Sequence, residues 1–292
     1  MPLGHELSFL DISATEIDEH PRVLSQVMAG HYSGLIVRAA YSEEQMQLAS
    51  ARLQSEQVKT LLHSPNQGMP GGELQTLGAA ATPTLTALNG PSKTVYAASS
   101  QQAEDWQKLI FGNFDMNQSI ASLFSKLYEQ KNCQPAPFQH TEKDQDSSHS
   151  PINQWLPFNY RIMPVGVQIY SHHDLHYRLP IYQNLSAEYD KSMLFSWFIT
   201  TQAAEQGGEL IVYGLTSDDP NPPLLPTRFV DTGALEKDYY KAKINLDAGD
   251  LILFNSGRYV HRVNQVGGSK ARMTIGGFLT RDKADTHLVY WS

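Results

Sequence analysis

Residues 161–174 read RIMPVGVQIYSHHD, an apolar run that ends in two histidines and an aspartate. We interpret Arg161–Tyr170 as a β-strand, and along a strand residues i and i+2 point to the same face. His172 and Asp174 are therefore expected to converge on one point where this strand ends. The motif is weak by itself, because a chain with eleven histidines produces H-x-D matches by chance.

The chain around this stretch contains further short strand-like runs separated by glycine, proline, asparagine and aspartate. They are Leu194–Thr200, Glu209–Leu215, Lys243–Leu246, Asp250–Phe254 and Met273–Leu279. Strands at this density are typical of an antiparallel sandwich or jelly roll.

The first half of the chain is expected to be rich in helices, after strand-like runs at Leu7–Ile12 and Gly34–Ala39. A helix is predicted from Ser42 to about Leu62, because Ser42 can cap the amides of a first turn that carries two glutamates. Apolar residues three and four apart predict a second helix over Ala103–Gln130, interrupted near Gly112.

The polar stretch Gln134–Pro151 is interpreted as a surface linker, and Cys133 as a helix-end residue. His140 and Glu142 form an H-x-E pair, for which a metal role is not favoured in so polar a loop. The predicted organisation is a helix-rich region over 1–150 packed on a catalytic core over 151–292, integrated as one domain.

Composition limits the kind of partner. Of 292 residues 41% are hydrophobic, enough for a substantial core, and the single cysteine excludes internal disulfides and multi-cysteine metal sites. The net charge of −8 without a basic cluster argues against a nucleic-acid surface. No long apolar run or leader-like start is seen, so we expect a soluble cytoplasmic protein with a small-molecule partner and no membrane partner.

A third metal ligand is expected far downstream, in AGDLILFNSGRYVHRV, residues 248–263. Here a turn at Gly249 and Asp250 precedes a buried strand, and His261 stands at the start of the next one. Two imidazoles and one carboxylate on one face form a facial triad, which leaves positions on Fe(II) open for a keto acid and for O2. We predict His172, Asp174 and His261 as ligands.

Arg272 opens the strand RMTIGGF, eleven residues after His261. A guanidinium pairs with the far carboxylate of 2-oxoglutarate through two charge-assisted hydrogen bonds, and Thr274 on the same face can add a hydroxyl donor. The alternative is an ordinary surface or ion-paired arginine.

At this point the sequence resembles the non-haem Fe(II) and 2-oxoglutarate-dependent oxygenases, and within them the subgroup of cyanobacterial indole-alkaloid (hapalindole/welwitindolinone) halogenases. The stretches that carry the resemblance are LSFLDISATEI, RIMPVGVQIYSHHD, GGELIVYGL, GDLILFNSGRYVHRV, RMTIGGFL and the terminal YWS. The resemblance spans nearly the whole chain and is weakest over about 63–150 and 215–242. It implies an α+β fold with a double-stranded β-helix (jelly-roll) core and N-terminal supporting helices.

One departure from that subgroup bears on the reaction. In those halogenases the residue two after the first iron-binding histidine is glycine, which vacates a position for chloride, whereas this chain has Asp174. The resemblance therefore implies an oxygenase that hydroxylates a small molecule, with desaturation or cyclisation as further outcomes. It also suggests that Arg161 approaches the 2-oxoglutarate, with a salt bridge in the barrel wall as an equal alternative.

Selectivity is expected to come from segment 175–190, the loop 217–231 and the N-terminal helices. Tyr177, Arg178, Tyr182 and Tyr189 are candidates to line the substrate pocket, although simple packing is favoured for any one of them. His173 is expected to point away from the iron by strand parity, and for His173 and His176 packing or exposure is favoured over substrate contact.

Three other functions remain open on the sequence alone. They are halogenation with the same cofactors, a non-catalytic jelly-roll protein that binds a metal, and a peptide hydroxylase. The intact set of candidate ligands disfavours the second, and the lack of a recognisable peptide-docking groove disfavours the third. Neither the substrate nor the oligomeric state can be inferred.

Overall fold

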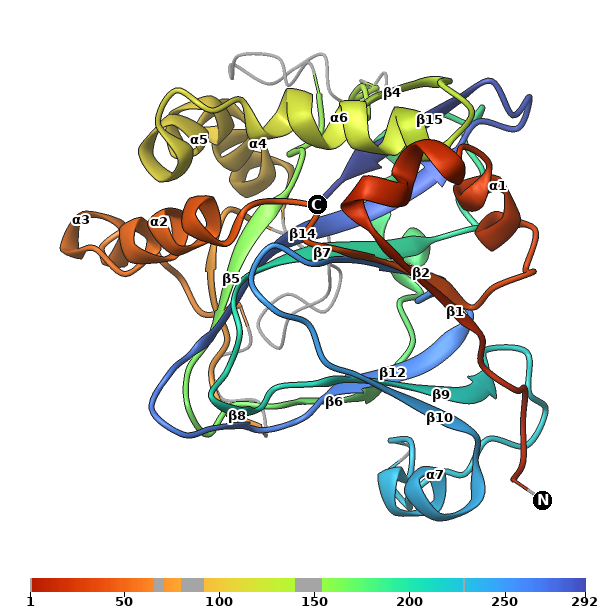
Figure 1. Cartoon of the computed structure of the whole chain (residues 1–292). Helices are drawn as coiled ribbons and strands as arrows, with labels where there is room; N and C mark the ends of the chain where they lie inside the picture. Colours follow the sequence, from red (N-terminus) through yellow and green to blue (C-terminus); the bar gives the residue numbers. More distant parts are fainter. Residues whose placement is uncertain (1, 66–70, 80–91, 140–153, 228) are drawn as a thin grey trace.

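Two β-sheets face each other, and helices cover the outer face of the larger sheet (Figure 1). This computed structural model describes residues 2–65, 71–79, 92–139, 154–227 and 229–292. The prediction of an α+β fold is confirmed.

The larger sheet has nine strands and is mostly antiparallel. Its central strand is the long β14, which pairs with β7 along one edge and with β5 and then β15 along the other. The order is β1 (Phe9–Ser13), β2 (Gly34–Arg38), β11 (Leu251–Phe254), β7 (Phe195–Gln202), β14 (Arg272–Arg281), β15 (His287–Trp291) and β4 (Asn132–Pro135), while β5 (Asn159–Met163) joins β14 to β3 (Gln75–Leu77).

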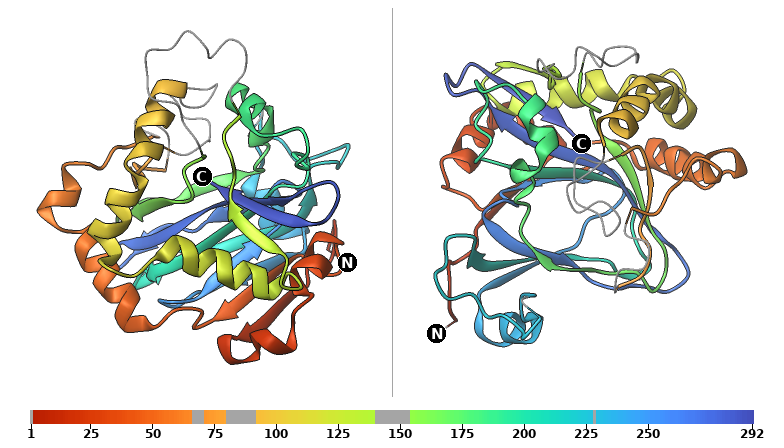
Figure 2. Two further views of the ribbon diagram at one scale, coloured as in Figure 1. Left: turned by 90° about the horizontal axis from the view of Figure 1, so that it is seen from above. Right: turned by 180° about the vertical axis from the view of Figure 1, so that it is seen from behind.

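The smaller sheet lies opposite the larger one, as the view from behind also shows (Figure 2). Its four strands run in the order β10 (Lys241–Ile244), β9 (Leu210–Thr216), β12 (Tyr259–Val263) and β6 (Ile169–His172), and β13 (Val266–Gly267) pairs separately with β8 (Gln206–Gly207). The chain passes back and forth between the two sheets, as in a double-stranded β-helix. The predicted jelly-roll core is confirmed.

The run predicted as one strand over 161–170 is in fact two strands in different sheets. β5 ends at Met163 and β6 begins at Ile169, because Pro164 lacks an amide donor and Gly166 adopts a positive φ of 89°. The turn carries the chain from one sheet to the other and so places β6 across the interior from β5. The other predicted runs each overlap an observed strand, although the one near Lys243 begins at Lys241.

Helices form the layer above the larger sheet, and α7 lies beneath the smaller one (Figure 1). They are α1 (Val23–Met28), α2 (Glu43–Leu53), α3 (Glu56–Lys59), α4 (Lys93–Gln101), α5 (Ala103–Phe111), α6 (Met116–Leu127) and α7 (Thr232–Asp238), with the 3-10 turns η1 (Ala14–Glu19), η3 (His176–Arg178) and η4 (Pro180–Asn184).

The predicted start of α2 is confirmed, but its predicted length is wrong. The Ser42 hydroxyl accepts a hydrogen bond from the amide of Gln45, as expected of a cap. The helix ends at Leu53 and not near Leu62, because Ser55 caps a new short helix, α3, by accepting from the amide of Val58. The interruption near Gly112 is confirmed, since α5 and α6 lie on either side of it.

The main core lies between the helical layer and the larger sheet. The Trp197 ring of β7 meets Phe124 of α6 edge to face at 5.4 Å, and the terminal Tyr290 and Trp291 are fully buried. Full burial of β11, with the sequence LILF, fits a strand covered on both faces. The helical layer therefore packs on the outer face of the larger sheet, and the inner face of that sheet is directed toward the smaller sheet.

The start of the predicted linker is instead part of the sheet. Cys133, expected at a helix end, and Gln134 lie in β4, which pairs in parallel with β15. This pairing joins segments about 150 residues apart, so no local pattern indicated it. His140 and Glu142 lie outside the described residues, and the boundary proposed near residue 150 stays a prediction.

Candidate functional site

His172 and His261 face each other on neighbouring strands of the smaller sheet. They are direct partners in the antiparallel pairing of β6 with β12, and their ring centroids are 4.3 Å apart. His261 lies in the middle of β12, not at its start as expected, because β12 begins at Tyr259. The sheet register alone therefore brings together two histidines 89 positions apart.

Asp174 completes the cluster just beyond the end of β6. Its amide donates to the carbonyl of Ser256 at 3.0 Å, which fixes the backbone where the strand has ended. Its Oδ1 lies 3.4 Å from Nε2 of His172, and its Oδ2 lies 3.6 Å from Nε2 of His261. One ligand atom from each of the three residues lies within 4.8 Å of the other two, so the predicted ligands can hold one metal ion.

The tautomers of the two imidazoles suit metal binding. Nδ1 of His172 contacts the carbonyl of Tyr170 at 2.7 Å, and Nδ1 of His261 contacts the carbonyl of Tyr259 at 3.1 Å. Because a carbonyl oxygen can only accept, each Nδ1 carries the hydrogen and each Nε2 keeps a free lone pair. Both lone pairs face Asp174.

The charges of the cluster follow from burial and proximity. Burial opposes ionisation of Asp174, but the neighbouring His176 and His261 and the hydrogen bond from His176 hold its pKa well below the usual range. Burial and the nearby His172 lower the pKa of His261 to about 3. The site therefore offers a carboxylate and a neutral imidazole at neutral pH, which are the forms that bind a metal.

Two further side chains contact the Asp174 carboxylate. The Ser196 hydroxyl of β7 donates to Oδ2 at 2.7 Å, and His176 Nε2 lies 2.8 Å from Oδ1. No motif in the sequence indicates a role for Ser196. Strand parity put it on the inner face of β7, but only the three-dimensional placement of β7 against the end of β6 reveals the contact.

Arg272 and Arg161 lie on the inner face of the larger sheet, on β14 and β5. Arg161 lies opposite Thr274 in the pairing of these strands, and Thr274 is two residues from Arg272 on the same strand face. The Arg272 guanidinium stacks over the Phe198 ring with 4.9 Å to the centroid, and Nε of Arg161 donates to the Asn159 side chain at 3.1 Å. Neither arginine forms an ion pair with any residue that the structure describes.

Both arginines are disfavoured in their charged form. Burial, together with the nearby Arg161, lowers the pKa of Arg272 to about 10, and burial lowers the pKa of Arg161 although Asp174 opposes this. Buried cations without counter-charge are costly. Thr274 is buried on the same face, and the hydroxyl of Thr200 opposite it has no hydrogen-bond partner among the described residues. This region is suited to an anion with several acceptor oxygens.

The residues expected to line a substrate pocket are spread over different environments. Arg178 is exposed and Tyr177 half-buried in η3, where the Arg178 guanidinium contacts the Tyr177 ring. Tyr182 is buried, and its hydroxyl accepts from Nε1 of Trp291 at 3.1 Å. Tyr189 is also buried, and its ring packs edge to face on His287.

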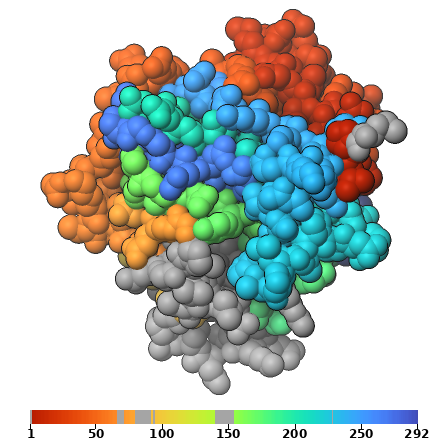
Figure 3. All heavy atoms as spheres, turned by 90° about the horizontal axis from the view of Figure 1, so that it is seen from below, coloured from red at the N-terminus to blue at the C-terminus, as the bar shows by residue number. Residues whose placement is uncertain are grey.

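The loop 217–231 lies at the surface seen from below, where it is drawn in cyan (Figure 3). It exposes the apolar side chains of Leu224, Leu225 and Phe229. The helix α7 that follows the loop is hydrogen-bonded to β6, which carries His172, because the hydroxyls of Thr232 and Ser171 lie 2.9 Å apart.

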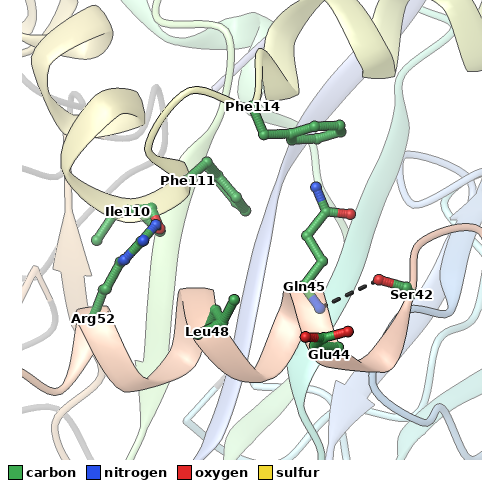
Figure 4. A pocket seen from close by; sticks show the side chains of 8 residues that line it. All are labelled: Ser42, Glu44, Gln45, Leu48, Arg52, Ile110, Phe111 and Phe114. Carbon is green, nitrogen blue, oxygen red and sulfur yellow. Dashed lines mark hydrogen bonds between the residues drawn. The ribbon is translucent and has the colours of Figure 1, made fainter.

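A separate groove of about 270 Å³ lies on the outside of the larger sheet, between α2 and α5 (Figure 4). Its apolar lining includes Leu48, Phe111 and Phe114, and the Arg52 guanidinium donates to the Ile110 carbonyl at 2.8 Å. The larger sheet separates this groove from the metal-binding cluster.

Among the described helices none has the length and apolar character needed to cross a membrane.

A family model described as carrier-protein-independent halogenase WelO5 matches residues 6–292. Comparison with curated protein sequences finds no match.

Solved structures share the fold at low identity. An N-substituted L-amino acid dioxygenase from Burkholderia ambifaria AMMD is 14% identical, with a TM-score of 0.51 over 96% of this chain and 91% of that one. Its complex with alpha-ketoglutarate is 13% identical, with a TM-score of 0.50 over 96% of this chain and 91% of that one. The epimerase SnoN from nogalamycin biosynthesis is 10% identical, with a TM-score of 0.46 over 92% and 85%. The first of these structures agrees with the jelly-roll fold.

Proposed function

The chain belongs to the WelO5 family of carrier-protein-independent halogenases, within the Fe(II) and 2-oxoglutarate-dependent oxygenases, and we propose that it hydroxylates an unactivated C–H bond of a small molecule. The observation that carries the proposal is the position of Asp174. Its carboxylate points at Nε2 of both His172 and His261, at 3.4 and 3.6 Å. A carboxylate there takes the position that chloride needs in a halogenase of this kind.

The residues present fit iron. Two imidazoles and one carboxylate are the donor set of facial-triad iron oxygenases, and the contacts of Nδ1 with the Tyr170 and Tyr259 carbonyls leave both Nε2 atoms available to a metal. His172, Asp174 and His261 would hold the metal. Bound Fe(II), with 2-oxoglutarate and O2, supplies the oxidising power that attacks a C–H bond, and the protein selects which bond lies in reach.

Arg272 is proposed to bind the far carboxylate of 2-oxoglutarate. Arg272 lies on the inner face of the larger sheet, it is buried, and it has no acidic partner in the described part of the chain. A diacid would supply the missing counter-charge through a bidentate pair. Arg161 would add a second cation and Thr274 a hydroxyl group. The nearby Asp174 carboxylate already offsets part of the Arg161 charge.

The substrate is proposed to be a free-standing small molecule of specialised metabolism, processed in the cytoplasm. Tyr177 and Arg178 remain candidates for its pocket because they are at least partly exposed and follow Asp174 closely in the sequence. Tyr182 and Tyr189 are proposed only as supports of that wall, since both are buried among other side chains.

Turnover tests the proposal most simply. The full-length protein, supplied anaerobically with Fe(II) and 2-oxoglutarate, should give a weak visible charge-transfer band. After air is admitted it should release succinate with a pool of candidate metabolites. A well-folded protein that gives neither signal would support the non-catalytic alternative instead.

Halogenation is the second candidate, because the family description names it. In the presence of excess chloride, the products of the wild-type protein are expected to gain the mass of oxygen and not of chlorine. Asp174→Gly would remove the carboxylate, and it is the matched variant in which a chlorinated product becomes possible. A chlorinated product from the wild-type protein would overturn the assignment to hydroxylation.

A further inference from the structure

His176 is buried directly beside the carboxylate of Asp174. Its Nε2 lies 2.8 Å from Oδ1, and the two side chains are only 10% and 7% exposed. A carboxylate oxygen accepts and does not donate, so Nε2 of His176 carries the hydrogen of this bond. This tautomer is the reverse of that of His172 and His261, whose Nε2 atoms lack a hydrogen. His176 therefore acts as a donor to the cluster.

The His176 ring is held in place from two sides. It packs edge to face on Phe278 of β14, with centroids 5.2 Å apart and planes at 62°. Its backbone carbonyl accepts from the amide of Leu179 at 2.8 Å, within the turn η3. A ring seated in this way loses little further freedom when it holds a hydrogen bond.

The two oxygens of Asp174 are held by different donors. His176 donates to Oδ1, and the Ser196 hydroxyl donates to Oδ2 at 2.7 Å. Ser196 and Phe278 are direct partners in the pairing of β7 with β14, so both supports come from one place in the larger sheet. Rotation of a carboxylate about its last bond is otherwise loosely restricted.

We propose that His176 is a positioning residue: its hydrogen bond fixes the orientation of the Asp174 carboxylate and so raises the affinity of the triad for its metal. This rests on the proposed function only in taking Asp174 as a metal ligand. A donor on a ligating carboxylate fixes its geometry, and loss of such a partner typically weakens metal binding by about 10–100-fold.

A purely packing role for His176 predicts a different outcome. If the ring only fills space against Phe278, an apolar side chain of similar length serves as well as a polar one. If the donor matters, a side chain of the same length that keeps an N–H restores function. His176→Met and His176→Gln form that matched pair.

The test measures the affinity of the full-length metal-free protein for Co(II), from the visible absorption band of the bound ion in competition with a chelator. His176→Met is expected to bind Co(II) about 10–100-fold more weakly than wild type, and His176→Gln within about threefold of it. His173→Met is the neighbouring control and is expected to bind like wild type, because no residue in the described part of the chain forms a hydrogen bond with Nε2 of His173. Thermal melting of each metal-free variant accompanies the titration.

Equal affinities for wild type and His176→Met would overturn the inference, as would equal losses in His176→Met and His176→Gln. Asp174→Ala separates this result from the proposed function. If it binds Co(II) as tightly as wild type, the metal-site assignment fails. If it does not bind while His176→Met binds normally, only the positioning role fails.

Discussion

Replacing Arg272 by methionine is expected to stabilise the metal-free protein while it weakens the binding of 2-oxoglutarate. Arg272 is 8% exposed and has no ion pair within the described residues, and burial with the nearby Arg161 lowers its pKa from 12.5 to about 10. One pKa unit corresponds to about 1.4 kcal/mol. The folded state therefore bears a cost of about 3 kcal/mol for keeping this side chain charged.

Methionine keeps an unbranched, apolar chain against Phe198 and removes the charge. After some loss of packing, the free energy of unfolding is expected to rise by about 1–3 kcal/mol, as when buried charges are replaced by apolar groups. The same change removes two charge-assisted hydrogen bonds to the diacid, so affinity for 2-oxoglutarate should fall by at least about 100-fold.

Urea denaturation of the metal-free protein gives the first quantity, and calorimetric titration with 2-oxoglutarate in the presence of Mn(II) gives the second. Arg281→Met is the control on the same strand, because Arg281 pairs with Asp285 at 2.9 Å. Its loss should lower stability by no more than about 1 kcal/mol and leave 2-oxoglutarate binding intact. A less stable Arg272→Met would show that the buried charge costs no stability, and a variant that binds the diacid normally would exclude Arg272 as its binding residue.

Three further outcomes are expected. A Cβ at Gly276 would lie 2.4 Å from the carbonyl oxygen of Trp197 in the neighbouring strand, so Gly276→Ala should cost about 1–3 kcal/mol in urea denaturation. Gly233→Ala in α7 should cost less, because the added Cβ would meet only the Asp231 side chain, at 3.2 Å; equal effects would contradict this. Although burial opposes it, hydrogen bonds from a lysine, a tyrosine and an arginine lower the pKa of Glu236 from 4.5 to about 2. The stability advantage of wild type over Glu236→Gln should therefore be full above about pH 4.5 and vanish as the pH falls toward 2, and a constant difference would exclude this ionisation as its source. Mn(II) at about 100 times its Kd should stabilise wild type by about 2.7 kcal/mol and leave Asp174→Ala unchanged, and a chelator should reverse the gain; stabilisation of both proteins would place the metal elsewhere.

The clustering of the three candidate metal ligands was predictable from the sequence because their geometry is partly local. His172 and Asp174 are two residues apart at a strand end, and the structure brings them together as parity suggested. His261 depended on the motif that follows Gly249, since only the register of β12 with β6 places it opposite His172. Arg272 followed from its place beside that motif.

The contacts around the ligands could not be predicted in the same way. Ser196 and His176 reach Asp174 through the packing of β7, β14 and η3, which depends on strand pairing across long separations. The sequence also did not indicate that the chain changes sheets after Pro164. Its apolar pattern continues through the turn, and the pattern alone does not distinguish one strand from two.

Helix ends and distant strand pairs are the features that the sequence predicts least well. The serine pattern at Ser42 marked the start of α2, but Ser55 carries the same capping chemistry and was overlooked as the start of α3. The pairing of β4 with β15 joins Cys133 to Leu288, and nothing near either residue indicates the other.

The most direct test is a crystal structure of the full-length protein grown anaerobically with Fe(II) and 2-oxoglutarate, with anomalous scattering at the iron edge. We expect one iron bonded to Nε2 of His172, to the Asp174 carboxylate and to Nε2 of His261, with the far carboxylate of the diacid on Arg272. Iron bound elsewhere, or an Asp174 side chain that stays off the metal while His172 and His261 bind it, would contradict it.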